Sequence, residues 1–301
     1  MITCDVCPRA CKLEEGQTGF CGVRTNIKGE NRDALYRQLY AWPRFSRQLS
    51  MRSYTAHLVG CNLKCFFCSL PFLSRPSPQN TPIEELSESE FVNRAVDLNV
   101  QAVSLFGGEP TLHHEYVAEV GRLCKENAIF TILPTNGYIN PWLASSLAKT
   151  VSRPIVGIKG SASETLYTRM SADSQTVLEA AKTFWEANDE TCLTDLVGPG
   201  LDAGRQEQER LAKWIRNNIS PDVSIIVQAL AGAADTPGPF RPWVGGTKNA
   251  HDESYKAAST LARNGLTNVW IQDVYGIERG WLEPGKIGLI QVTGHGTGER
   301  R

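Results

Sequence analysis

The sequence predicts an α/β protein whose main part is a parallel sheet, closed or partly closed into a barrel, with a small cysteine-rich cap in front of it. Short apolar, mostly β-branched runs alternate with helix-like segments over most of the chain. Strands separated by helices in this way pair in parallel. The length of 301 residues and the hydrophobic content of 41% are sufficient for one large core.

Three zones follow one another along the chain. Residues 1–53 are rich in cysteine, glycine and charge, have little periodicity and are expected to form a metal-binding cap. Residues 54–275 contain the alternation, and residues 276–301 are expected to be an irregular tail. The apolar runs are YTAHLVG, QAVSLF, IFTILP, RPIVGI, TCLTDLV, DVSIIVQAL and NVWIQDV. The helix-like segments between them are 83–98, 114–127, 141–149, 174–188, 204–217 and 252–264.

Composition limits the setting and the partners. The net charge of −1 gives no field for general binding to nucleic acid or to an anionic membrane. No apolar run is long enough to span a bilayer, and the amino terminus lacks the apolar segment of a secretory signal. We therefore expect a cytoplasmic protein. Nine cysteines in a reducing compartment indicate metal binding or catalysis rather than disulfides. Cys124 and Cys192 stand alone and are expected in the core.

The ends of the predicted strands have an unusual composition. In a barrel of parallel strands, the loops at the carboxyl ends converge on one rim, where the chemistry takes place. Five consecutive strands end here in thiols, bare backbone or polar side chains. These ends are Cys61, then Gly107, Gly108, Glu109 and Pro110, then Thr135, Asn136 and Gly137, then Lys159 and Gly160, then Gly198, Pro199 and Gly200. Packing alone does not explain this pattern.

Three cysteines follow the first strand closely. Cys61, Cys65 and Cys68 have the spacing C-x3-C-x2-C on a short loop, so their sulfurs can face one inorganic centre. Thiolates suit zinc and iron–sulfur clusters. A structural zinc needs four protein ligands, whereas a cubane cluster on three cysteines leaves one iron open. The spacing favours a cluster, and the alternative is a zinc site completed by a distant His or Cys.

Four further cysteines lie in the predicted cap. Cys4, Cys7, Cys11 and Cys21 have the spacing C-x2-C-x3-C-x9-C, which is a complete set of four ligands. Such a set suits a closed site, either a structural zinc or an auxiliary, fully protein-ligated cluster. Free thiols without a metal are the remaining alternative.

Together with Phe67, the three cysteines form a C-x3-C-x-aromatic-C signature that resembles that of the radical S-adenosylmethionine (SAM) enzymes. FGGEPTL and TNG stand where that family has matching motifs. The amino-terminal segment is similar to a branch related to pyruvate formate-lyase activating enzyme, which includes the AmmeMemoRadiSam group. The resemblance covers roughly residues 4–230 and implies a partial TIM-like (β/α)6 barrel. It also implies a [4Fe-4S] cluster whose open iron chelates SAM.

The resemblance further implies an activity. SAM would be cleaved reductively to a 5′-deoxyadenosyl radical that abstracts hydrogen from a substrate, which for the activating enzymes is a protein glycine. An electron donor such as a flavodoxin or ferredoxin is implied as a partner. Radical modification of a small molecule or methyl transfer is one alternative. A non-catalytic, zinc-stapled protein that binds a partner is another.

By the same resemblance, SAM is bound by Phe67, by the segment from Gly107 to Pro110, by Asn136 and by Lys159. The two glycines let the backbone approach the SAM amino group. Glu109 complements that ammonium, and Asn136 hydrogen-bonds the ribose or the methionyl part.

Two departures from the activating enzymes concern the following strands. Lys159 stands in VGIKGSASETLY, which resembles their D-x-K-x(n)-Y segment with its SAM carboxylate lysine, but Gly157 replaces the aspartate. LVGPG and the helix after it also resemble them. The next strand, SIIVQAL, has no histidine, and Gln228 occupies that neighbourhood. His113 follows the GGEP loop and is expected at the surface, where a histidine at a helix start usually lies. A position at the site is the alternative.

Overall fold

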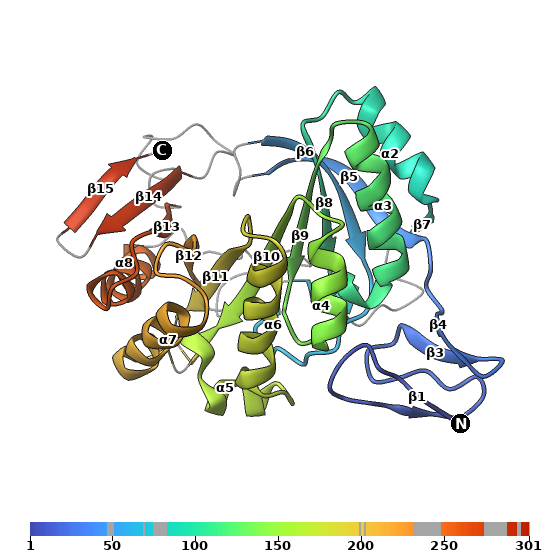
Figure 1. Ribbon diagram of the computed structural model, residues 1–301, viewed down its shortest axis with the longest axis horizontal. Coiled ribbons are helices and arrows are strands. Elements are labelled where there is room, and N and C mark those ends of the chain that lie inside the picture. The colour runs from blue at the N-terminus through green and yellow to red at the C-terminus, as the bar shows by residue number, and fades with distance from the viewer. Residues whose placement is uncertain are drawn as a thin grey trace.

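The computed structural model describes residues 1–46, 51–68, 70–74, 83–198, 200–201, 203–230, 248–273, 288–293 and 296–300. Within these residues, eleven strands form one sheet in the order β15-β14-β13-β12-β11-β10-β9-β8-β6-β5-β7. Helices cover the outer face of this sheet (Figure 1). The order has two ends that do not pair with each other, so the barrel is partial.

Seven neighbouring strands run parallel, and each overlaps one of the seven apolar runs. They are β6 (Met51–Leu58), β8 (Ala102–Gly107), β9 (Phe130–Thr135), β10 (Arg153–Lys159), β11 (Cys192–Val197), β12 (Ile225–Ala229) and β13 (Val269–Asp273). Every residue of β11 and β12 is buried, as expected for strands covered on both faces. The predicted α/β fold with a parallel central sheet is confirmed.

Helices connect the parallel strands. The α-helices are α1 (Pro71–Ser74), α2 (Glu88–Asp97), α3 (His114–Glu126), α4 (Pro141–Ala148), α5 (Glu164–Arg169), α6 (Ser174–Ala187), α7 (Arg205–Asn218) and α8 (Lys248–Arg263). Short 3-10 helices are η1 (Pro110–His113) and η2 (Gly160–Ala162). The helix predicted from residue 83 begins later, because Ser87 and Glu90 form a capping box at its start. None of the described helices is both long and apolar enough to span a bilayer.

The sheet extends further at both edges than the sequence predicts. β5 (Gln38–Ser46) pairs antiparallel with β6 and with the short β7 (Glu84–Glu85). The predicted boundary of the cap at residue 53 is therefore wrong, because β5 and the start of β6 belong to the main sheet. The cap itself contains β1 (Ile2–Thr3), β2 (Lys12–Leu13), β3 (Arg24–Ile27) and β4 (Glu30–Asp33).

The carboxyl-terminal segment is also more regular than expected. β14 (Gly288–Thr293) pairs antiparallel with β13, and β15 (Gly296–Arg300) pairs with β14. Ile290 and Val292 are two positions apart on β14 and are both buried, which explains why this segment joins the sheet. The prediction of an irregular tail is wrong for these strands, and residues 276–287 lie outside the described residues.

The cap is joined to the barrel by buried polar contacts. Arg24, only 2% exposed, donates to both carboxylate oxygens of Glu115 on α3 at 2.8 and 2.9 Å. Asp33 hydrogen-bonds one ring nitrogen of His113 at 2.7 Å, and the other ring nitrogen donates to the carbonyl of Val59 at 2.7 Å. His113 is therefore fully buried, and the prediction that it lies at the surface is wrong. These contacts fix the cap beside the loops that follow β6 and β8.

Candidate active site

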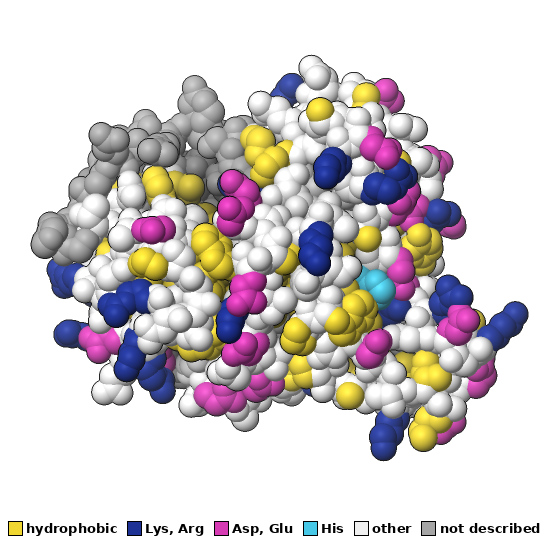
Figure 2. All heavy atoms as spheres, in the orientation of Figure 1, with side chains coloured by type: hydrophobic (Ala, Val, Ile, Leu, Met, Phe, Trp, Pro, Cys, Tyr) yellow, Lys and Arg dark blue, Asp and Glu magenta, His cyan; other side chains and the backbone are white. Residues whose placement is uncertain are grey.

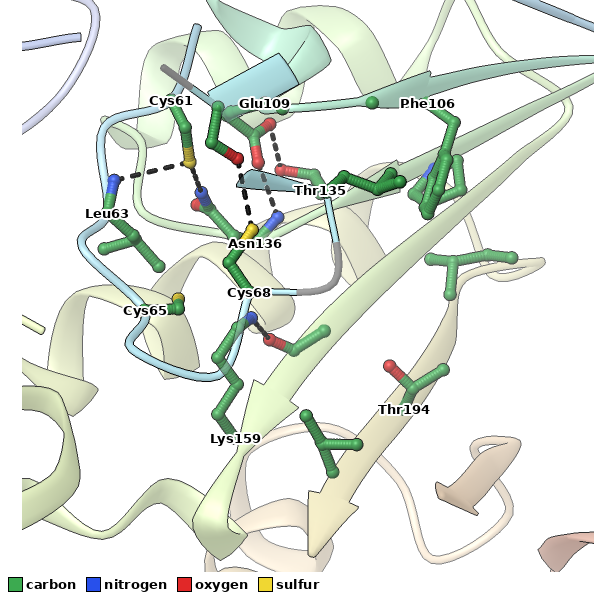
Figure 3. A pocket seen from close by; sticks show the side chains of 18 of the residues that line it. Cys61, Leu63, Cys65, Cys68, Phe106, Glu109, Thr135, Asn136, Lys159 and Thr194 are labelled. Carbon is green, nitrogen blue, oxygen red and sulfur yellow. Dashed lines mark hydrogen bonds between the residues drawn. The ribbon is translucent and has the colours of Figure 1, made fainter. Parts of the chain in front are cut away.

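A pocket lies at the carboxyl ends of the parallel strands, as expected for a barrel (Figure 3). About 970 Å³ of open space, part of it bulk solvent, lies between its lining residues. All ten residues predicted for the barrel cluster and for SAM line it: Cys61, Cys65, Phe67, Cys68, Gly107, Gly108, Glu109, Pro110, Asn136 and Lys159. The fifth strand end predicted from the sequence is Gly198, Pro199 and Gly200, and of these Pro199 lies outside the described residues.

The three cysteines occupy one side of this pocket. Cys61 Sγ lies 3.5 Å from the backbone nitrogen of Leu63 and 3.7 Å from Nδ2 of Asn136, and both groups donate to it. Burial raises the pKa of the Cys61 thiol, and the nearby Glu109 carboxylate raises it further. A cationic centre would reverse this effect and stabilise the thiolate. The thiol donors and their N–H partners therefore fit a metal centre.

The donor chemistry of these residues fits an iron–sulfur cluster. Such clusters are held by cysteine thiolates, and the three cysteines of one short loop line the same pocket.

The loop after β8 packs backbone against backbone on the loop that leads to Cys61. The Gly108 N–H donates to the carbonyl of Leu58 and the Glu109 N–H to that of Gly60, both at 2.8 Å. A Cβ on Gly108 would lie 2.0 Å from the Gly60 oxygen. Gly107 has φ +119°, a conformation that side chains rarely adopt. The two glycines thus permit a close approach, as the sequence predicts.

Glu109 braces two of the loops. Its carboxylate, 1% exposed, accepts from the N–H and hydroxyl of Thr111 at 3.1 and 2.6 Å. It also accepts from the Thr135 hydroxyl and from the Asn136 N–H, both at 2.7 Å. The loops after β8 and β9 are thereby linked. The sequence indicates Glu109 and Thr135 at the ends of their strands but not Thr111, and only the fold shows that both threonines donate to Glu109.

Asn136 is tied to the cysteine loop. Its Nδ2 donates to Oδ1 of Asn62 at 2.9 Å, and its Oδ1 accepts from the backbone of Tyr138 at 2.8 Å. Asn62, fully buried, donates in turn to the Tyr138 carbonyl at 2.6 Å. Sequence analysis missed Asn62, although it directly follows the first pocket cysteine.

Lys159 extends from the end of β10. Its Nζ donates to the carbonyl of Gly157 at 2.9 Å, and its backbone N–H donates to the hydroxyl of Tyr167 at 3.2 Å. The lysine and the tyrosine of the VGIKGSASETLY segment therefore meet. The residue that replaces the expected aspartate contacts the lysine through its backbone.

Asp195, which the sequence analysis missed, holds the turn after Lys159. Gly160, Ser161 and Ala162 all have positive φ. Asp195 accepts from the Ser161 N–H at 2.9 Å and from its hydroxyl at 2.7 Å. Burial raises the pKa of Asp195 to about 6 despite these hydrogen bonds. A charged residue inside the apolar run TCLTDLV was the available signal.

The other side of the pocket is mainly apolar. Figure 3 shows Phe106 and Thr194 there, opposite the cysteines. Ile155, Leu196 and Leu230 also line the pocket. Gln228 lines it too and donates to Gln272 at 2.8 Å.

A partial parallel barrel with three cysteines at its rim defines a class of cofactor-dependent enzyme folds. The sequence model of the Radical SAM superfamily matches residues 55–225. The chain belongs to this superfamily, and the predicted family and fold are confirmed. The uncharacterized protein MJ0808 of Methanocaldococcus jannaschii is 25% identical over 233 residues, 74% of this chain and 69% of that protein.

Pyruvate formate-lyase 1-activating enzyme of Escherichia coli K12 is 23% identical over 162 residues, 52% of this chain and 66% of that enzyme. Among solved structures, Streptococcus suis SuiB bound to its precursor peptide SuiA superposes with a TM-score of 0.54 at 18% identity. The match covers 75% of this chain and 50% of SuiB, so this chain spans about half the length of that protein. The likeness to SuiB shows a shared fold.

We predict that Gly108→Ala disrupts the pocket, because the new methyl group meets the Gly60 carbonyl. The free energy of unfolding should fall by roughly 1–3 kcal/mol, and less iron should bind after anaerobic reconstitution. Gly204→Ala is the matched control, since its Cβ meets only the end of the Glu207 side chain. A Gly108→Ala protein that equals the control in denaturant titration and iron content would contradict the prediction.

We also predict that Asp195→Asn changes how stability depends on pH. Because the folded-state pKa is raised to about 6, the unfolded chain ionises first as pH rises from 4, and the wild type loses stability between pH 4 and 6. The neutral variant lacks this loss. The difference in free energy of unfolding, variant minus wild type, should therefore grow by about 2 kcal/mol between pH 4 and pH 7. A difference independent of pH in urea titrations would disprove this.

Proposed function

We propose that this chain is a radical SAM enzyme that holds a [4Fe-4S] cluster on Cys61, Cys65 and Cys68 and uses SAM to abstract hydrogen from a protein glycine. The observation that carries the proposal is that four kinds of group line one pocket. They are the thiols of the three cysteines, the glycine backbone after β8, the Asn136 amide and the Lys159 ammonium. When bound, the cluster would supply the electron that cleaves the sulfonium–C5′ bond of SAM to give a 5′-deoxyadenosyl radical.

The residues around the cluster would orient SAM. The backbone at Gly107 and Gly108 is bare enough to accept the amino group, and the buried charge of Glu109 favours an ammonium nearby. Glu109 acts mainly through the loops it holds, because four protein donors already occupy its oxygens. The Lys159 ammonium, on its flexible stem, would turn from the Gly157 carbonyl to the SAM carboxylate.

Phe67, Pro110 and Asn136 complete the proposed SAM site. The Phe67 ring is buried at the pocket wall and offers an apolar face. Pro110 begins η1 and fixes the direction of the chain after Glu109. Asn136 lies between the cysteine loop and the pocket, where its amide would contact the ribose or the methionyl group.

A protein or peptide substrate is supported by the uncharged far side of the pocket. Thr194 and Gln228 offer hydrogen-bonding groups among apolar residues, which suits a backbone amide better than a charged small molecule. The relative from E. coli is an activating enzyme, and SuiB was solved with a precursor peptide. We therefore favour a protein glycine over small-molecule modification or methyl transfer.

The electron donor is proposed to be a small acidic protein such as a flavodoxin or ferredoxin. Basic groups lie over exposed aromatic rings near the cysteine loops: Arg9 and Lys64 are 3.7 and 4.5 Å from the centre of the Phe20 ring. Arg169 lies 4.3 Å from the centre of the Phe66 ring, which is 51% exposed. Such a surface attracts an acidic partner and offers apolar contact.

Cys65→Ala should abolish SAM cleavage, because it removes one of three ligands of the proposed cluster. Reconstituted protein would be incubated anaerobically with dithionite and SAM, and 5′-deoxyadenosine and methionine would be measured. Cys192→Ala, which removes a buried thiol outside the pocket, is the matched control and should retain activity. Equal activity of the two variants would contradict the proposal, and S-adenosylhomocysteine as the product would favour methyl transfer instead.

A further inference from the structure

The fold gathers the four amino-terminal cysteines in the cap. The Cys4 N–H donates to the carbonyl of Cys11 at 2.9 Å, which closes the first loop. The Cys11 sulfur lies 3.5 Å from the position of a Cβ on Gly19, so it faces the turn that leads to Cys21. Cys4, Cys7 and Cys21 are buried, and Cys11 is partly exposed. All four are free of disulfides.

Protein N–H groups already point at two of these sulfurs. Nδ2 of Asn31 lies 3.4 Å from Cys4 Sγ, and the backbone N–H of Arg24 lies 3.4 Å from Cys21 Sγ. The Arg24 guanidinium bonds both the side chain and the backbone carbonyl of Asn31, which fixes the two donors relative to each other. Hydrogen bonds of this kind stabilise metal-bound thiolates and tune the potential of iron–sulfur clusters.

The attachment of the cap to the barrel does not depend on a metal staple. The cap shares an apolar core with the barrel and is also held by the Arg24 and His113 contacts. A set of four cysteines is a complete ligand set for a closed iron–sulfur cluster.

The cap site lies directly against the barrel site. The Cys61 N–H donates to the carbonyl of Cys21 at 3.1 Å, so one hydrogen bond joins a cysteine of each set. Arg9 donates to the carbonyl of Asn62 at 2.8 Å, beside the first pocket cysteine. A metal ion that only stabilised the cap would not need to lie in contact with the cysteine loop of the pocket.

We propose that Cys4, Cys7, Cys11 and Cys21 hold a second iron–sulfur cluster, closed to outside ligands, in direct electronic contact with the cluster on Cys61, Cys65 and Cys68. A low-potential one-electron donor protein reduces the cap cluster by one electron. That electron passes to the oxidised barrel cluster, and the cap cluster returns to its oxidised state. The proposed cluster in the cap is argued from the contacts of the cap cysteines alone, whereas the electron transfer rests on the proposed function.

The first experiment separates the two sites by metal content. The Cys61/Cys65/Cys68→Ala triple variant, reconstituted anaerobically, should retain about four iron and four sulfide per chain and give an iron–sulfur EPR signal on reduction. The wild type should contain about twice as much iron. A triple variant that binds one zinc and no iron, or no metal, would overturn the proposal. Circular dichroism and gel filtration check folding, and a Cys→Ser triple variant repeats the test.

The second experiment tests the contact between the sites. A Cys4/Cys7→Ser variant should keep the barrel cluster alone and still cleave SAM with dithionite, which checks the proposed function separately. Reduced wild type should give an EPR spectrum broadened by spin coupling, unlike the sum of the spectra of the Cys4/Cys7→Ser variant and the barrel triple variant. A wild-type spectrum equal to that sum would refute direct contact, while absence of SAM cleavage in both wild type and Cys4/Cys7→Ser would count only against the proposed function.

Discussion

The site depends on one contact between two backbones that have no side chains between them. Gly108 lies against the carbonyl of Gly60, and any Cβ there would overlap it. The close approach lets the Glu109 N–H reach that carbonyl and places Glu109 where it links two loops. On the other side of the same loop, the Cys61 N–H faces the carbonyl of Cys21. The cysteine loop, the GGEP loop and the cap are thereby held together by main-chain groups.

The central sheet could be predicted from the sequence because its strands are buried on both faces. Such strands are continuous apolar runs separated by helices, and this local pattern is sufficient to place all seven. The edge strands could not be predicted in the same way. β5 and β14 pair antiparallel with strands that the pattern had already assigned, and their own sequences mix polar and apolar residues. Their place in the sheet depends on pairing with a neighbour.

The site was predictable wherever a residue stands at the end of a strand, since parallel strands bring their ends to one rim. The ten pocket residues follow from this rule together with the family motif. Asp195 and Asn62 act through partners 34 and 74 residues away, so no local pattern reveals them. His113 shows the opposite error: a polar residue at a helix start was assigned to the surface, yet it is buried and hydrogen-bonded to a carboxylate of the cap.

Charged side chains of both signs are scattered over the face seen in Figure 2, as the small net charge leads one to expect.

The unclosed circle of strands has a consequence for the interior. An eight-stranded barrel fills its centre with layers of side chains. Among the described residues, antiparallel β5 and β14 flank the seven parallel strands, and there is no eighth parallel strand. The centre therefore leaves room for the pocket, and β5 and β14 cover the edges of β6 and β13, which would otherwise be exposed to pairing with other molecules. Incomplete closure is what gives this architecture both its hollow middle and an open flank.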